Sequence, residues 1–141
     1  MTMRKNDPIQ NIMSKSIHSV QKGQPISEVF KILHSYKIHH VPVLHGESLV
    51  GIVSSTDLMQ LSFGAQGYDS NQMWSFIDSQ HALVDVMTSD LKTLNQSDVV
   101  RDAAQALASG SYHSLPITDQ QGKLVGMVTS TDLINYLCEQ Y

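Results

Sequence analysis

The 141-residue sequence contains one cysteine, Cys138, and few positive charges. A single cysteine excludes an internal disulfide and a thiolate metal cluster, which fits a reducing cytoplasm. We expect Cys138 to pack within the last helix region as a small apolar side chain. The 9 Lys and Arg residues are outnumbered by 13 Asp and Glu, and no basic stripe is present. This charge balance argues against nucleic acid as a main partner.

Long apolar runs are also missing, so the sequence predicts no membrane segment. The basic residues near the N-terminus reach Pro8 without an intervening apolar stretch, which argues against a secretory signal. Aromatic residues make up only 6% of the chain, while hydrophobic residues make up 41%. These values are ordinary for a globular protein of one or two small domains. We therefore expect a cytoplasmic protein without a membrane partner.

An internal repeat dominates the sequence. The block GIVSSTDL at Gly51–Leu58 returns as GMVTSTDL at Gly126–Leu133. An offset of 74 relates the earlier positions of the two copies, for example Met13 to Met87. The offset becomes 75 after a turn, as expected for a hairpin loop that tolerates a change of length.

Each repeat predicts the element order β-α-β-β-α. A short strand comes first, followed by a helix with an apolar face, two antiparallel strands joined by a tight turn, and a closing helix. A unit of about 55 residues is marginal alone, so we expect the two repeats to share a core with pseudo-twofold symmetry. The fold class is α+β, with small three-stranded sheets flanked by helices. The expected first strands are Ile17–Val20 and Leu91–Leu94, and the expected helix faces are Ile26, Val29, Phe30, Leu33 (after Pro25 at an N1-like position) and Val100, Ala103, Ala104, Leu107.

Composition shifts divide the chain into four parts. Residues 1–8 are polar and predicted to form a flexible arm, residues 9–63 form the first repeat, and residues 83–141 form the second. The linker 64–82 has no counterpart elsewhere and reads as loop, with a short helical or extended patch at Met73–Ile77. We expect Trp74 and Phe76 to pack over the rest of the molecule.

The most informative polar residues lie at the two strand-to-helix junctions. Ser54 precedes Asp57 by three residues, and Thr129 precedes Asp132 by the same spacing. This spacing predicts a capping box in which hydroxyl and carboxylate satisfy backbone amides. It also suits a nucleotide, because a helix N-terminus attracts phosphate while a carboxylate accepts the hydroxyls of a ribose diol. The two interpretations remain open at this point.

Taken together, the motifs resemble a tandem pair of cystathionine β-synthase domains, the CBS pair or Bateman module. The resemblance covers about Ile9–Tyr141 and rests on features repeated in the same order. These features are Met13-Ser14 and Met87-Thr88, the stretches Lys37–Val43 and Tyr112–Ile117, and the two blocks ending in Ser-Thr-Asp. Members of this family are regulatory modules rather than enzymes. The resemblance implies that an adenosine-containing ligand such as AMP, ADP, ATP, NAD or S-adenosylmethionine binds in the cleft between repeats.

The resemblance also assigns site residues. Asp57 and Asp132 would bind the ribose diol, and hydroxyls would contact ribose and phosphate from Ser54, Thr56, Thr129 and Thr131. The purine would lie against the first strand and take backbone hydrogen bonds near the proline-containing strand, at Ile17, His18, Val20, His40, Val41, Pro42, Leu91, Thr93, Ser114, Leu115 and Pro116. The candidate phosphate contacts are Lys22, Lys37, His39, Arg101 and His113. Because these cations are few, a monophosphate such as AMP is the favoured ligand.

Other functions are less well supported by the residues. The adjacent His39 and His40 would point to opposite sides of an extended segment, which disfavours a shared metal ion. No nucleophile elbow or glycine-rich phosphate loop is present, so we expect no enzymatic activity and no required cofactor.

We therefore predict a stand-alone regulatory module that senses an adenosyl ligand, forms a homodimer and signals to an unidentified regulated protein. The alternative is a ligand-independent module for dimerisation or for docking a partner protein. In either case the closing helices would supply the association face, through Leu58, Met59, Leu61, Leu133, Ile134 and Leu137.

Overall fold

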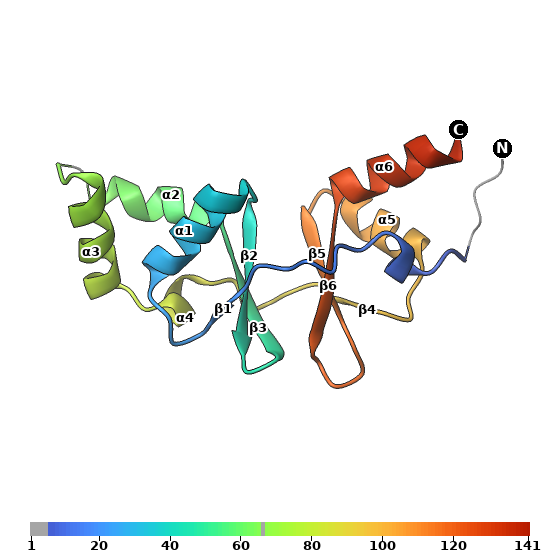
Figure 1. The fold of residues 1–141 in the computed structure, drawn as a ribbon, viewed down its shortest axis with the longest axis horizontal. Helices are drawn as coiled ribbons and strands as arrows, with labels where there is room; N and C mark the ends of the chain where they lie inside the picture. Colours follow the sequence, from blue (N-terminus) through green and yellow to red (C-terminus); the bar gives the residue numbers. More distant parts are fainter. Residues whose placement is uncertain (1–5, 66) are drawn as a thin grey trace. The chain divides into compact units, whose positions relative to one another are not determined.

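The structure is a computed structural model that describes residues 6–65 and 67–141, and its contacts divide the chain into two compact units (Figure 1). The central unit is His18–Leu91. The terminal unit combines Lys92–Tyr141 with the N-terminal segment up to Ile17. The chain therefore passes from one unit to the other twice, once near residue 17 and once near residue 91.

Each unit contains one three-stranded sheet, and the two sheets have the same topology. The first strand is parallel to the second, and the second pairs antiparallel with the third. The strands are β1 (Val20–Gln21), β2 (His40–His45) and β3 (Ser48–Ser54) in the central unit, and β4 (Leu94–Asn95), β5 (Ser114–Thr118) and β6 (Leu124–Thr129) in the terminal unit. The predicted α+β class with small three-stranded sheets is confirmed, whereas the pseudo-twofold symmetry remains a prediction.

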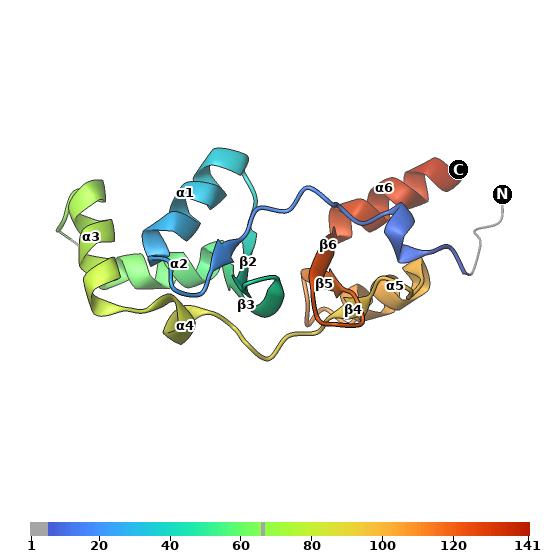
Figure 2. The same ribbon diagram turned by 60° about the horizontal axis from the view of Figure 1, so that its bottom comes forward.

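Six α-helices accompany these sheets in the described part of the chain (Figure 2). They are α1 (Ile26–Tyr36), α2 (Ser55–Phe63), α3 (Ser70–Gln80) and α4 (Leu83–Val86) in the central unit, and α5 (Val100–Ala108) and α6 (Ser130–Gln140) in the terminal unit. The predicted apolar faces of α1 and α5 are confirmed, since Ile26, Val29 and Ala103 are completely buried. Pro25, however, is the N-cap of α1 rather than its first helical residue, because its ψ of 155° is extended.

The first strand of each repeat is shorter than predicted. Of Ile17–Val20 and Leu91–Leu94, only Val20 and Leu94 take part in a ladder, each followed by one further paired residue. The division of the chain explains the difference. Residues 17 and 91 are where the chain passes between units, so the backbone there does not run alongside β2 or β5.

The opening segments of the two repeats are exchanged between the units. Ile9, in the short 3-10 helix η1 (Ile9–Asn11), is completely buried in the core of the terminal unit, although it belongs to the first repeat in sequence. Leu83 is its equivalent in the second repeat and is buried in the core of the central unit. Each exchanged segment also pairs with the last strand of that sheet: Ser14 exchanges backbone hydrogen bonds with Met127, and Thr88 with Ile52, at 2.8 to 3.0 Å.

Residues 7 and 8, at the end of the expected arm of residues 1–8, are hydrogen-bonded to the start of α5 or paired beside it. The backbone N–H of Val100 donates to the carbonyl oxygen of Asp7 at 2.8 Å, and Pro8 bridges to Val99. The hydroxyl of Tyr136 donates to the Asp7 carboxylate, which ties the segment to α6. Residues 1–5 of the expected arm lie outside the described residues.

The linker contains a complete helix, α3, where we expected mainly loop. Asp69 caps it, with the Gln72 N–H donating to the Asp69 carboxylate at 2.8 Å, and this Asp-x-x-Gln spacing is the local sequence signal for the helix start. The packing predicted for Trp74 is confirmed, since its ring stacks on Phe30 at a centroid distance of 4.5 Å and only 9% of the residue is exposed.

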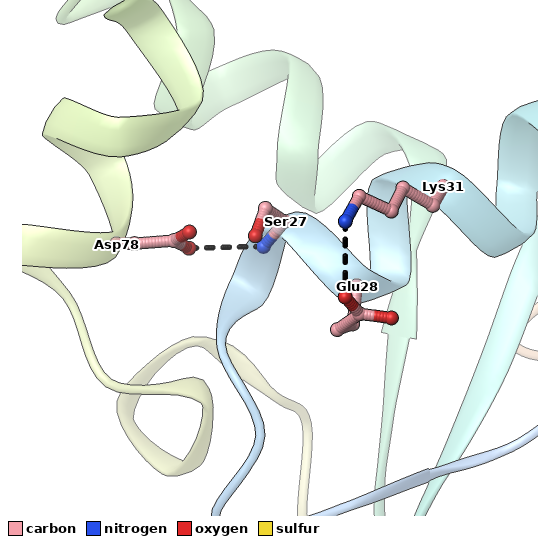
Figure 3. Close-up of polar contacts among 4 residues, drawn as sticks. All are labelled: Ser27, Glu28, Lys31 and Asp78. Atoms are coloured by element: carbon pink, nitrogen blue, oxygen red, sulfur yellow. Dashed lines mark hydrogen bonds and ion pairs between the residues drawn. The ribbon is translucent and has the colours of Figure 1, made fainter. Parts of the chain in front are cut away.

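The other end of α3 is joined to α1. The Ser27 N–H donates to Asp78 Oδ1 at 2.9 Å, so a carboxylate from α3 caps the first turn of α1 (Figure 3). The two residues that form this hydrogen bond are 51 positions apart in the sequence.

We expect Asp78→Ala to destabilise the protein by about 1 kcal/mol, because the Ser27 N–H loses its acceptor and α1 loses its hydrogen bond to α3. Lys31→Ala is the control. It removes the exposed Lys31–Glu28 ion pair of Figure 3, which should contribute less than about 0.5 kcal/mol. Urea unfolding of the two variants measures the difference, and equal midpoints would show that the Asp78 cap does not hold α3 in place.

Two further findings concern the exposure of Cys138 and the length and polarity of the helices. Cys138 is exposed on α6 and does not pack as expected, because the residue of that helix buried in the core is Tyr136. In the described part of the chain, every helix is too short or too polar to cross a lipid bilayer.

Candidate functional site

The two hydroxyl–aspartate junctions adopt the same structure at the starts of α2 and α6. The Ser54 N–H donates to Asp57 Oδ2 at 2.8 Å, and the Asp57 N–H donates to Ser54 Oγ at 3.2 Å. Thr129 and Asp132 repeat this arrangement at 2.8 and 3.4 Å, and the Thr129 hydroxyl also donates to Asp132 Oδ2 at 3.2 Å. The predicted capping boxes are therefore confirmed in both units.

Capping uses only part of each carboxylate. In both residues Oδ2 accepts the cap hydrogen bonds, while Oδ1 accepts none from the described residues. Asp57 and Asp132 are half-buried. At the start of α2, the Ser55 N–H donates to the carbonyl of His39, and the N–H of Thr56 has no acceptor in the described residues. The side chains of Thr56 and Thr131 are exposed.

Strand pairing brings the proline-containing strand to each cap. His40 lies opposite Ser54 in the antiparallel ladder, and Ser114 lies opposite Thr129. The side chains that follow, Val41 and Leu115, are completely buried, and the prolines after them are buried as well. Val41 and Leu115 therefore belong to the cores of their units. Because β1 and β4 pair only with the far ends of β2 and β5, the backbone near each cap has one edge without a strand partner in the described chain.

The candidates from the first strands have different environments. The side chain of Val20 belongs to the core and is 2% exposed, so it is not presented to a ligand. Ile17, His18, Leu91 and Thr93 are half-buried in the segments near the crossings. His18 stacks on Tyr36 with ring centroids 3.5 Å apart. Tyr36 was not among the predicted site residues, and no motif or spacing marks it as the partner of His18.

The candidate phosphate contacts separate into two groups. His39 adjoins the Ser54 cap through its hydrogen bond to Ser55, and His113 directly precedes Ser114. Lys37 lies two residues before His39, with a left-handed φ of 53°.

Lys22 and Arg101 do not lie at the cap of their own unit. The Lys22 N–H donates to the carbonyl of Leu44, four residues along β2 from His40, or about 13 Å at strand spacing. Arg101 occupies the first turn of α5, which follows β4 at the corresponding end of β5.

No cluster for a metal ion is found in residues 6–65 and 67–141, where His, Cys, Asp and Glu do not gather in threes. The site that the structure assembles in each unit consists of a capped helix start, a carboxylate with one oxygen outside the cap, exposed threonines and the start of the proline-containing strand. Such a set offers acceptors to a diol and donors to an anion or a heterocycle.

Comparisons with family models, with related sequences and with solved structures all indicate the same family. The family of the CBS domain matches residues 9–64 and 83–139. A homoserine O-acetyltransferase of Methanocorpusculum labreanum is 29% identical over 89% of this chain. The chain spans 23% of that protein, or about a quarter of the length of such relatives.

Solved structures share the fold. The crystal structure of CBSX2 in complex with AMP has a TM-score of 0.78 and 24% identity, covering 95% of this chain and 98% of that chain. The CBS domain pair of protein MJ0100, in complex with 5-methylthioadenosine and S-adenosyl-L-methionine, has a TM-score of 0.76 and 22% identity, covering 96% and 99%. The matched family and the repeated geometry lead to one conclusion: the chain belongs to the CBS domain family and is a tandem CBS pair.

Proposed function

We propose that this chain is a regulatory CBS pair that binds an adenosyl ligand at the Asp57 and Asp132 caps, with AMP as the first candidate. The observation that carries the proposal is the Oδ1 atom of each carboxylate, which takes no part in the cap. A capping role alone explains Oδ2, but it gives no hydrogen-bond donor to the second oxygen in either unit. The two hydroxyls of a ribose would both donate to the carboxylate.

The proposed roles follow from position. Asp57 and Asp132 accept the ribose hydroxyls, and the hydroxyls of Ser54, Thr56, Thr129 and Thr131 bind ribose or phosphate. The base would lie beside the residues of the proline-containing strand next to each cap, His40 and Ser114. His39 and His113, which adjoin these residues, would meet the phosphate. This is a small set of cations, which suits a monophosphate better than a triphosphate.

Relatives of the same fold support this ligand class. AMP is bound in the CBSX2 structure, and two other adenosyl compounds are bound in the MJ0100 pair. Regulation would follow if the ligand bound one conformation of the module more tightly than another. Its effect on a partner can be no larger than that difference in affinity. Because the enzyme relatives are several times longer, their reactions are not assigned to this chain.

Thermal unfolding in the presence of AMP, ADP, ATP, NAD or S-adenosylmethionine tests the proposal, with GMP as the non-adenine control. A ligand at about one hundred times its dissociation constant stabilises the folded state by about 2.7 kcal/mol. For a chain of this size the midpoint should rise by roughly 8 °C. An equal rise with GMP would show that the site does not recognise adenine, and no rise with any compound would contradict the proposal.

A second candidate function is a docking or dimerisation module, favoured by apolar residues on the closing helices. Met59 on α2 and Ile134 on α6 are each 58% exposed, and Leu137 is 39% exposed. Leu58, which we expected in the same face, is buried in the core of its unit at 4% exposure. We propose that the exposed apolar residues of α2 and α6 join two chains. Sedimentation at micromolar concentration should show a dimer, and a monomer there would contradict the homodimer.

A further inference from the structure

His18 and Tyr36 form an aromatic stack in the central unit. Their ring centroids lie 3.5 Å apart, and the ring planes are only 13° from parallel. His18 is half-buried, whereas Tyr36 is 54% exposed. Neither residue belongs to the buried core of the unit, so the stack lies at its surface.

The topology places this stack at the end of the central sheet that carries the Ser54–Asp57 cap. Tyr36 is the last residue of α1, and His40, four residues later, lies opposite Ser54. Because β1 is parallel to β2, both strands run away from this end, whereas β3 ends here and enters α2 (Figure 1). His18 precedes β1 by two residues. The stack and the cap are therefore at the same end of the sheet.

The contact with Tyr36 restricts the imidazole of His18 to one orientation. A histidine ring is one of the side-chain surfaces on which a nucleobase stacks. Stacking of a base on an aromatic side chain raises affinity by about tenfold. A ring that is already held loses less conformational freedom when a base is added, so the support from Tyr36 favours binding.

The corresponding positions of the terminal unit carry no rings. The offset of 74 between the repeats relates His18 to Lys92, which is exposed and lines a hollow beside α5 together with Asp102. The same offset relates Tyr36 to Gly110, which has no side chain. Both caps share the hydrogen bond from backbone N–H to carboxylate, but only the central unit has a ring at the position of His18.

We propose that His18, held by Tyr36, stacks on the base of the adenosyl ligand and makes the site of the central unit the tighter of the two. This inference rests on the proposed function, because it concerns the base of the ligand whose ribose would bind Asp57. Tyr36 is a positioning residue that acts through His18. The site at Asp132 lacks the stack and should bind the same ligand about tenfold more weakly.

Calorimetric titration of AMP into Tyr36 variants tests the stack. Tyr36→Leu should weaken binding at the tighter site about fivefold, and Tyr36→Phe, which keeps the ring, should stay within about twofold of the wild type. Tyr68→Leu is the matched control, because Tyr68 is 48% exposed and stacks on Phe76. It should leave the affinity unchanged.

Two results of this titration would overturn the proposal. Equal affinities of Tyr36→Leu and Tyr68→Leu would show that the stack does not contribute to binding. Tighter binding by Tyr36→Leu would show that the tyrosine occupies the place of the base instead of supporting it.

Ribose 5-phosphate, which has no base, separates lost stacking from damage to the cap. Its affinity, measured by displacement of AMP, should be the same for the wild type and for Tyr36→Leu. An equal loss of affinity for AMP and for ribose 5-phosphate would overturn the proposal, because Tyr36 would then support the cap and not the base.

The two cap variants assign the tighter site to a unit. The wild-type chain should show two sites whose affinities for AMP differ about tenfold, with Asp57→Asn weakening the tighter site and Asp132→Asn the weaker one. The reverse assignment, or two equal sites, would overturn this inference and leave the adenosyl function intact. A folded wild-type chain that binds no AMP would instead contradict the proposed function, and this inference with it.

Discussion

Replacing Asp57 with Asn should weaken AMP binding in the central unit about thirtyfold while leaving the helix cap in place. The amide oxygen of Asn can still accept the Ser54 N–H, so the start of α2 remains satisfied. The ribose hydroxyls, however, lose a charged acceptor. A hydrogen bond to a charged group contributes about 1.5 to 3 kcal/mol and a neutral one about 1, so two such bonds lose roughly 2 kcal/mol. Calorimetric titration of AMP measures the change.

Asp132→Asn should act in the same way on the terminal unit, and in the double variant both units should bind AMP about thirtyfold more weakly than in the wild type. Asp102→Asn is the control. The Asp102 carboxylate accepts the Val99 N–H at 3.0 Å at the start of α5, the same contact as at Asp57 but without a hydroxyl partner and with no proposed ligand. If Asp102→Asn weakens AMP binding as much as Asp57→Asn, the effect comes from the caps in general and not from ribose contacts.

Gly51→Ala should give a large loss of stability. A Cβ at position 51 would lie 2.8 Å from Met87 Cγ and 3.1 Å from Met87 Cβ, too close for the side chain alone to move aside. Met87 belongs to the segment of the second repeat that packs in the central unit. We expect a cost of about 1 to 3 kcal/mol from overpacking, which lowers the thermal midpoint by roughly 3 to 10 °C. Gly126→Ala should behave alike, because its Cβ would lie 2.9 Å from Met13 Cγ.

Shortening the methionine should relieve this clash. The double variant Gly51→Ala/Met87→Ala should be less destabilised than the sum of its two single variants, since the residues are in contact. Gly23→Ala serves as the control, because nothing lies within 4 Å of its Cβ position. Additive effects of Gly51→Ala and Met87→Ala in calorimetric melting would contradict the contact.

The repeat explains why so much of the fold could be predicted. The apolar spacing of Ile26, Val29 and Leu33 is set by local geometry, and so are the capping pairs at Ser54 and Thr129. Their copies one repeat later provide an independent check within a single sequence. Fold class, hairpins and caps could therefore be derived from short-range patterns alone.

Features that depend on residues far apart in the sequence could not be predicted from such short-range patterns. The exchange of Ile9 and Leu83 between units does not change any local pattern, because each is an apolar residue before a strand in either arrangement. The exposure of Cys138 depends on which face of α6 packs against the rest of its unit. Tyr136 is the residue that is buried on the packed face.

The candidate site was predicted in part. The two carboxylates and their hydroxyl partners follow from spacing, and the structure adds that only one oxygen of each carboxylate takes part in the cap. The cations were harder to place, because sequence gives their charge without their position. Lys22 and His39 illustrate the difference: strand register puts the first at the far end of β2 and the second beside the cap.

Calorimetric titration of AMP into the wild-type chain, with GMP as the comparison, decides whether this CBS pair is an adenosyl sensor. We expect saturable heat with AMP, none with GMP, and about thirtyfold weaker AMP binding in the Asp57→Asn/Asp132→Asn double variant. A folded wild-type chain that releases no heat with AMP or with S-adenosylmethionine would contradict an adenosyl sensor. The docking module would then be the function to pursue.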